Sequence, residues 1–433
     1  MKSSNEEYFT RSVTELADIV PVTTSQAVYS TTGIKLVNKN VRLDSSFFER
    51  LGRHSILPPL EQCLVVENGV NTRELALVAE HLLEKDQRLV SLVNGLHNHE
   101  NIFDVIQGIV LSRPMIFLLT LARERRPELL THSVKVTLIS IYLGIKLNLP
   151  AKQLIEMASA GMFHDLGELR IDSNLLKEDA HHSPAEREEI FTHPATSQRM
   201  LLNSSIYSLD IINAVMRHHE YIDGSGFPFG LMGVEMGQLS KILSLAEIVA
   251  TCLDREAQDS VARLEVVLKF NLTKFDPVML SYLSPLYEHG AEGNEESNTL
   301  TFVSEPYLNN QINNIRLALV YWQRMLGNIA IRPRSASAYI HKRLNSLLQA
   351  TREAGINTLD KNSVTNAIGG DPKCMVELNQ INKETLRQIM EIVFEVQRRW
   401  PTFQSDMTDV GKVVSSWMEH MQELLLEERE RKL

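Results

Sequence analysis

Histidines and carboxylates gather in several short segments of this chain, and these residue types either bind metal ions or move protons. The most concentrated segment is HHEYIDGSGFP, residues 218–228, where two histidines, a glutamate and an aspartate precede two glycines and a proline. Glycine and proline shape a backbone around a ligand, and packing alone rarely needs both kinds of residue within so short a stretch. The segment therefore indicates a functional site whose partners must come from elsewhere in the chain.

Other segments supply such partners. ELLTHSV places Glu128 four residues before His132, so both side chains share one face of a predicted helix. ILSLAEIVATCL places Glu247 inside an apolar helical pattern, where a charge is costly unless a cation meets it. The candidate metal ligands are Glu128, His132, His164, Asp165, His193, His218, His219 and Glu247.

Each candidate alone has a simpler explanation. A lone histidine in a helix is more often a hydrogen-bonded core or surface residue, and Glu128 with His132 can form a surface contact. Glu247 can pair with Lys241 on its own helix. Together, however, five histidines and three carboxylates recur along successive helices, as a metal site in the core of a helical bundle requires. Imidazoles and carboxylates without a thiolate indicate iron, manganese or zinc.

The composition is that of an ordinary globular protein. The 433 residues suffice for two or three domains, and 43% are hydrophobic and 23% charged. A net charge of -10 argues against broad binding to a nucleic-acid polymer or an anionic membrane. Cys63, Cys252 and Cys374 lie far apart, so we expect buried thiols in a reducing compartment. The polar N-terminus and a charged, proline-broken apolar window at residues 102–122 predict a cytoplasmic protein without a membrane span.

The first seventy residues differ in pattern from the rest. AVYSTTGIKLVNKNVRLD alternates apolar and polar residues around Thr32 and Gly33, which predicts a short β-hairpin, and SSFFERL predicts a capped helix. From Thr72 onward, apolar residues at three-four spacing predict helices, including stretches at 101–121 and 131–147. The predicted domains are a small α+β module at residues 1–70, a helical domain at 71–290 with its core motifs at 114–250, and a C-terminal helical region at 300–433.

Two local signals mark boundaries. Ser183 as N-cap, Pro184 in the first turn and Glu186 closing a capping box predict a helix start in HSPAEREEIF. The polar stretch at residues 288–298 predicts a linker, and the chain beyond it is again helical.

Residues from about 114 to 250 resemble the HD-GYP phosphohydrolases, a branch of the HD superfamily. The matching pieces are HSVKV, FHDLGE, THP, MRHHEYIDGSGFPFGL and KILSLAEI, in the family's order and at approximately its spacing. The resemblance covers roughly a third of the chain. It implies a mainly α fold, with an HD-type helical bundle between the small N-terminal α+β module and a C-terminal helical extension. It also implies two or three divalent metal ions, usually iron or manganese, and hydrolysis of cyclic di-GMP to pGpG or GMP.

Residue by residue, the resemblance assigns metal-ligand roles to His132, His164, Asp165, His193, His218 and His219. Glu128 matches an additional carboxylate associated with a third metal, and Asp165 would bridge two ions. Asp165 and Glu168 occupy the catalytic positions. Asp223, Gly224, Gly226, Phe227 and Pro228, together with Lys241 and Arg255, would contact the substrate or partner proteins, notably diguanylate cyclase domains.

The sequence departs from the family's pattern in four places. Phe227 replaces a tyrosine, and Glu247 replaces an aspartate, which lengthens a ligand by one methylene group. Glu168 replaces the lysine of the HDxGK motif, so a phosphate-binding cation becomes an anion, for which Arg170 or Lys177 would have to compensate. The stretch after Glu247 lacks the family's tyrosine and arginine patterns and offers Arg255 as its nearby cation.

These departures leave two predicted functions. The first is a metal-dependent phosphodiesterase acting on cyclic di-GMP. The second is a catalytically weak or inactive module that binds metal, nucleotide or a partner protein. Another HD phosphohydrolase, acting on a nucleotide or its monoester, is disfavoured by the DGSGFP loop.

Three further segments have simpler interpretations. RERR at residues 123–126 resembles a basic nucleotide-binding patch, but a solvated helix end before Pro127 is the simpler prediction. IGGDP at residues 368–372 predicts a turn although it resembles the start of a diguanylate cyclase signature. ALVYWQRML and VVSSWMEHMQELLL carry tryptophans and methionines that predict a core of their own, with a homodimer face as the alternative.

Overall fold

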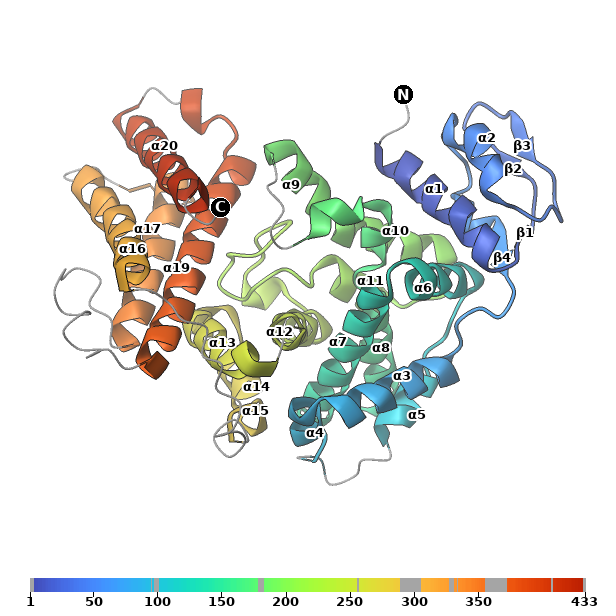
Figure 1. Cartoon of the computed structure of the whole chain (residues 1–433), viewed down its shortest axis with the longest axis horizontal. Helices are drawn as coiled ribbons and strands as arrows, with labels where there is room; N and C mark the ends of the chain where they lie inside the picture. The colour runs from blue at the N-terminus through green and yellow to red at the C-terminus, as the bar shows by residue number, and fades with distance from the viewer. Residues whose placement is uncertain are drawn as a thin grey trace. The chain divides into compact units, whose positions relative to one another are not determined.

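The computed structural model describes residues 4–94, 96, 101–177, 183–254, 257–288, 305–326, 331–332, 334–354, 372–405 and 408–430. Its contacts divide the chain into two compact units. The first consists of Met1–Ala257 with Leu272–Glu292, and the second of Gln258–Asn271 with Gly293–Leu433. The fold is mainly α, as predicted, and its strands are short (Figure 1). The division into three domains stays a prediction.

The first unit begins with the predicted α+β elements. These are α1 (Ser4–Ile19), β1 (Val22–Thr24), β2 (Val28–Tyr29), β3 (Lys35–Val37), η1 (Ser45–Phe47), α2 (Phe48–Gly52), η2 (Leu60–Gln62) and β4 (Leu64–Val66). β2 and β3 pair antiparallel, which confirms the predicted hairpin, and Gly33 adopts a φ of +83° in its turn. β1 pairs antiparallel with β4, so the module closes on itself. The expected capped helix is η1 running into α2, with the Asp44 side chain as N-cap.

The helices of the first unit follow. They are α3 (Thr72–Lys85), α4 (Gln87–Asn94), α5 (Asn101–Gln107), α6 (Arg113–Arg125), α7 (Pro127–Lys146), α8 (Ala151–Phe163), η3 (Leu166–Arg170), η4 (Ser173–Leu176), α9 (Pro184–Ile190), α10 (His193–Ser204), α11 (Leu209–Met216), η5 (Gly233–Glu235), α12 (Gln238–Leu253), η6 (Leu272–Lys274), α14 (Pro277–Ser281) and α15 (Pro285–Glu288). The capping box at Ser183 and Glu186 is present as predicted. The helical stretch predicted at 101–121 is present as two helices, α5 and α6, because Ser112 caps a new helix that has Pro114 in its first turn.

Helix α7 is the central helix of this unit, packed against α8 and α12 (Figure 1). It is long and apolar enough to meet the length and composition test for a membrane span, yet 78% of that stretch is buried within the protein. This helix is therefore a core helix of the unit, and its packing against α12 brings His132 to Glu247.

The N-terminal module contacts η3, the segment that follows His164 and Asp165. Glu61 is buried and accepts two hydrogen bonds of 2.9 Å from Arg170 Nη2 in η3. The Arg170 guanidinium also lies 4.1 Å from the ring centroid of Phe9 in α1. These contacts fix the far end of η3 against the module.

The second unit contains α13 (Ala257–Phe270), α16 (Glu305–Leu326), α17 (Ala336–Glu353), α19 (Pro372–Arg399), η7 (Phe403–Ser405) and α20 (Asp409–Glu430). Trp322 and Trp417 are buried in its hydrophobic core, with ring centroids 5.8 Å apart. This confirms that the tryptophans build a core of their own. The homodimer stays a prediction.

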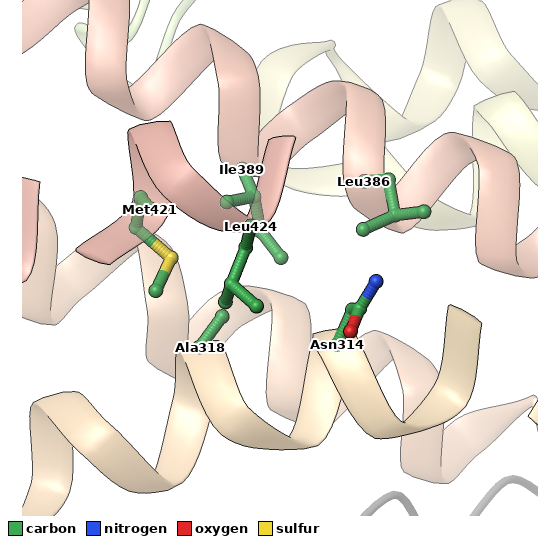
Figure 2. Close-up of a pocket in the computed structure, with 6 residues that line it drawn as sticks. All are labelled: Asn314, Ala318, Leu386, Ile389, Met421 and Leu424. Carbon is green, nitrogen blue, oxygen red and sulfur yellow. The ribbon is translucent and has the colours of Figure 1, made fainter. Parts of the chain in front are cut away.

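Helices α16, α19 and α20 also enclose a small cavity of about 10 Å³, lined mostly by apolar side chains (Figure 2). This volume is at the lower limit for holding one water molecule. Residues 289–298 of the expected linker and residues 368–371 of IGGDP lie outside the described part of the chain. Cys63 and Cys252 are buried thiols as expected, whereas Cys374 is exposed, so the expectation is wrong for that residue.

Candidate metal centre

Two groups of ligand-type side chains meet in the first unit and share one carboxylate. The first group is His132, His164, Asp165 and Glu247, and the second is Asp165, His193, His218 and His219. Within each group the potential ligand atoms lie within 4.8 Å of one another. Seven of the eight predicted ligands thus come together, and Asp165 belongs to both groups, as expected of a bridging carboxylate.

Helix ends bring most of these side chains to one place. His164 is the C-cap of α8, Asp165 is the N-cap of η3, and His193 is the first residue of α10. His218 and His219 follow Arg217, the C-cap of α11. The helix interiors contribute His132 from α7 and Glu247 from α12.

Three imidazoles are anchored in the same way, because the Nδ1 atom of each contacts the backbone carbonyl three residues earlier. The distances are 2.8 Å for His164, 2.7 Å for His193 and 2.6 Å for His218. A carbonyl oxygen only accepts hydrogen bonds, so Nδ1 must carry the proton. In the neutral form of each imidazole, Nε2 then presents a lone pair toward the interior of the site, which is the arrangement of a histidine that ligates a metal.

The second group contains acceptors that face other acceptors. His193 Nε2 lies 3.1 Å from Nε2 of both His218 and His219. Asp165 Oδ1 is buried 3.3 Å from Nε2 of His193 and of His218, and it has no hydrogen-bond donor among the described residues. Lone pairs this close repel unless a cation lies between them, so this set of atoms fits a divalent metal ion.

In the first group, one oxygen of Glu247 reaches two imidazoles. Glu247 Oε2 lies 2.9 Å from His132 Nε2 and 3.1 Å from His164 Nε2. The alternative pairing of Glu247 with Lys241 is therefore wrong. The longer side chain still delivers a carboxylate oxygen to the group, and Thr251 donates a hydrogen bond of 2.9 Å to the other oxygen.

Asp254 is a contributor that the sequence reasoning missed. Its Oδ2 atom lies 2.5 Å from His132 Nδ1, so it orients the imidazole whose Nε2 faces the centre. Lys135 Nζ donates to the other oxygen of Asp254. Asp254 follows Glu247 by seven residues on the same helical path, and this spacing is the signal that would have identified it.

The two groups differ in their electrostatics. Burial lowers the pKa of His193 to about 4, against the opposing attraction of Asp165, so this imidazole is neutral at pH 7. Burial also acts to lower the pKa of His164, but the charge of Asp165 and its hydrogen bond outweigh that effect and raise the pKa to about 10. The carboxylates therefore attract a positive charge to the centre, which a metal ion can supply in place of a proton.

Glu128 is the one predicted ligand that belongs to neither group. Its side chain is 65% exposed, and its Oε1 atom accepts a hydrogen bond of 2.5 Å from Arg126 Nε. The prediction of a solvated helix end at 123–126 is wrong for Arg126, because its side chain is only 10% exposed.

Glu168 lies beside the centre. Its side chain is 19% exposed, and Oε2 lies 3.5 Å from Arg126 Nη2. Burial raises the pKa of Glu168 to about 8, and repulsion by Asp165 adds to this shift. The cations expected to compensate for Glu168 lie elsewhere: Arg170 pairs with Glu61, and Lys177 donates to Asn174.

The loop that contains the two glycines packs against the second group. The Phe227 ring stacks on the His219 ring, with centroids 4.6 Å apart and planes 21° apart. A Cβ atom on Gly226 would lie 2.3 Å from the His219 carbonyl oxygen, so only glycine allows this approach. Glu220, which the sequence reasoning left unused, accepts backbone N–H bonds of 2.6 Å, 3.1 Å and 2.9 Å from residues 229–231.

The remaining residues of the predicted substrate or partner set lie in the same loop, in α12 or outside the described residues. Asp223 accepts a hydrogen bond from the Ser225 backbone, and Gly224 adopts a φ of +77°. Pro228 continues the same loop. Lys241 lies in the first turn of α12. Arg255 lies outside the described residues.

Comparisons with known proteins agree with this site. The sequence pattern of a family described as HD domain matches residues 117–269. A cyclic di-GMP phosphodiesterase of Pseudomonas aeruginosa is 30% identical over 166 residues, which is 38% of this chain and 40% of the relative. A 3'3'-cGAMP-specific phosphodiesterase of Vibrio cholerae is 25% identical over 124 residues, 29% of this chain and 27% of the relative. A cyclic di-GMP phosphodiesterase of Borreliella burgdorferi is 27% identical over 156 residues, 35% of this chain and 41% of the relative.

The matches span at most 41% of the length of these three relatives, and the family match at residues 117–269 includes both metal-ligand groups. The motif resemblance, the family match and the converging ligands agree with one another. The chain contains an HD domain, as its resemblance to the HD-GYP proteins implied.

Proposed function

We propose that this protein is a metal-dependent phosphodiesterase that hydrolyses cyclic di-GMP to pGpG or GMP. The observation that carries the proposal is Asp165, a buried carboxylate shared by two groups of converging ligand atoms. The relatives from Pseudomonas aeruginosa and Borreliella burgdorferi are named for cyclic di-GMP, and the one from Vibrio cholerae for 3'3'-cGAMP. All three names describe phosphodiesterases of cyclic dinucleotides, which supports this substrate class.

The residues would hold two divalent ions, with iron or manganese best suited to the nitrogen and oxygen donors and zinc also compatible. Such ions, when bound, activate water at neutral pH and neutralise the oxygens of a phosphodiester. The chain itself keeps the Nε2 lone pairs in place through the carbonyl anchors on Nδ1. Asp254 fixes the orientation of His132, and the Phe227 ring covers one face of His219 and excludes water from it.

A third ion with Glu128 as a ligand stays a prediction, and so do catalytic roles of Asp165 and Glu168. Diguanylate cyclase domains as partners of the glycine-containing loop also stay a prediction. Phe229 at 60% exposure and Val234 at 96% exposure leave apolar surface on that loop, which suits a protein contact.

The test is an assay of the purified protein loaded with iron or manganese, in which chromatography follows the conversion of cyclic di-GMP to pGpG. We expect Asp165→Asn to lower turnover by about 10³-fold or more, because one carboxylate serves both groups. Asp210→Asn, an exposed change of the same chemistry on α11, is the matched control and should leave turnover unchanged. A wild-type protein that is inert toward cyclic di-GMP and 3'3'-cGAMP with every first-row metal overturns the proposal.

A second candidate is a metal-binding module with little catalysis, which the placement of Glu168 favours. The position that carries a phosphate-binding lysine in the HD-GYP pattern holds a carboxyl group here, so it supplies no positive charge to a phosphodiester substrate. If this candidate is right, Glu168→Lys creates turnover that the wild type lacks. Wild-type turnover equal to that of the variant dismisses it.

A further inference from the structure

Arg126 occupies a fixed position between two helices of the HD domain. Its backbone N–H donates to Ala122 at the end of α6, and its carbonyl accepts from Leu129 in the first turn of α7. The backbone is therefore held at both sides, and the side chain is 10% exposed. Arginine keeps its positive charge at any ordinary pH, so this is a permanent and largely buried cation.

Two carboxylates hold the guanidinium but leave part of it unused. Nε donates to Glu128 at 2.5 Å, and Nη2 lies 3.5 Å from Glu168 Oε2. Nη1 is buried and has no acceptor among the described residues. A buried donor without an acceptor destabilises the folded protein, so a purely structural role for Arg126 would leave that cost unexplained.

Both carboxylates belong to segments that carry the metal ligands. Glu128 lies one helical turn before His132 on α7. Glu168 follows Asp165 in η3, and its backbone N–H donates to the Asp165 carbonyl at 2.9 Å. The guanidinium is thus held beside the metal centre, on the side of the shared carboxylate.

We propose that Arg126 Nη1 binds a non-bridging phosphate oxygen of the substrate. This inference rests on the proposed phosphodiesterase function and names the residue that receives the substrate's charge. A guanidinium is a planar donor fork that suits phosphate oxygens, and Glu128 and Glu168 fix its plane while they leave one nitrogen free for them. The role assigned to Arg126 is substrate binding, and Glu128 and Glu168 are positioning residues for it.

The test compares Arg126→Gln with Arg123→Gln in the metal-loaded, full-length protein. Arg123 lies on α6 and pairs with Glu74 and Glu124, so its substitution makes the same chemical change elsewhere on that helix. Calorimetric titration measures binding of two probes, cyclic di-GMP and inorganic phosphate. We expect Arg126→Gln to weaken binding of both about 10–100-fold, the loss of one charge-assisted hydrogen bond, while Arg123→Gln binds as the wild type does.

Metal content and melting temperature, measured for each variant, separate substrate binding from a structural effect. We expect Arg126→Gln to keep the wild-type metal content, and Arg126→Lys, which retains the charge without the fork, to fall between wild type and Arg126→Gln in affinity. Unchanged phosphate affinity in Arg126→Gln, or a wild type that binds no phosphate, overturns the inference. If the wild type binds phosphate through Arg126 but neither binds nor hydrolyses a cyclic dinucleotide, the proposed function fails and the anion site stands.

Discussion

Both units of this protein bury polar side chains, but a cluster around Glu384 in the second unit pairs its carboxylate with donors. Glu384 Oε1 accepts from Gln388 Nε2 at 2.8 Å and from Asn271 Nδ2 at 3.3 Å. Gln388 in turn accepts from Arg343 Nη2 at 3.3 Å. The Glu384 carboxylate therefore faces donors rather than other acceptors, and it needs no cation from outside the protein.

The metal centre of the first unit lacks this balance. The Nε2 atoms of His193 and His218 lie 3.1 Å apart although both carry lone pairs, and Asp165 Oδ1 has no donor among the described residues. Burial of polar side chains is common to both regions, so burial alone does not indicate function. An excess of acceptors at one point does, because only a cation resolves it.

Metal removal should give the largest difference between the two regions. Trp322, Trp400 and Trp417 are the protein's three tryptophans and all lie in the second unit, so their fluorescence reports that unit. We expect a chelator to abolish turnover and to destabilise the first unit by about 2.7 kcal/mol or more where the free ion had been 100-fold above its Kd. Calorimetry should show this shift while the tryptophan-monitored transition stays in place. An equal shift in both would contradict the assignment of the ions to the first unit alone.

Glu220 allows the same comparison within the first unit, because its carboxylate accepts hydrogen bonds from three backbone N–H groups and needs no cation. Glu220→Gln replaces one accepting oxygen by an N–H group that faces backbone N–H donors, so we expect a loss of about 2 kcal/mol in unfolding free energy. Glu235 in the same loop is exposed and accepts one backbone N–H from Met232 at 2.8 Å. Glu235→Gln, the control, should change stability by less than about 0.5 kcal/mol in urea unfolding. Equal effects of the two variants would show that the Glu220 contacts do not stabilise the loop.

Glu384→Gln should give the smallest effect. The amide keeps one oxygen for Gln388 and Asn271 but loses the charge that pairs with Arg387, so we expect a cost of about 1 kcal/mol in the second unit. Turnover and metal content should stay at wild-type levels. Denaturation followed by tryptophan fluorescence measures the cost, and a loss of bound metal in this variant would break the distinction between the two clusters.

The sequence could predict the seven ligand-type side chains that converge, because most of them lie in short motifs at helix ends, where placement is local. The hairpin at β2 and β3 and the capping box at Ser183 are also local and were predictable. Asp254, Arg126 and Glu220 were harder, because their roles depend on which atoms meet after folding.

The contact between Arg126 and Glu168 illustrates this limit. Forty-two positions separate the two residues, and no periodicity in RERR distinguishes the buried arginine from its more exposed neighbours. Glu128 shows the opposite case, since its spacing from His132 satisfied the motif while its side chain turned to Arg126. A spacing fixes the face of a helix but not the partner that a flexible side chain selects.

The contacts of Arg170 with Glu61 and Phe9 determine how short a fragment of this protein can be without losing part of the site. The family match begins at residue 117, yet the guanidinium that ends η3 is seated on residues far upstream of that point. A fragment limited to the matched residues would lack Glu61 and Phe9, so Arg170 would lose both contacts. The segment η3, which begins after Asp165, would then no longer be held in place at its far end. We therefore expect that a fragment needs the N-terminal module as well as the matched residues to keep Asp165 in its position between the two ligand groups.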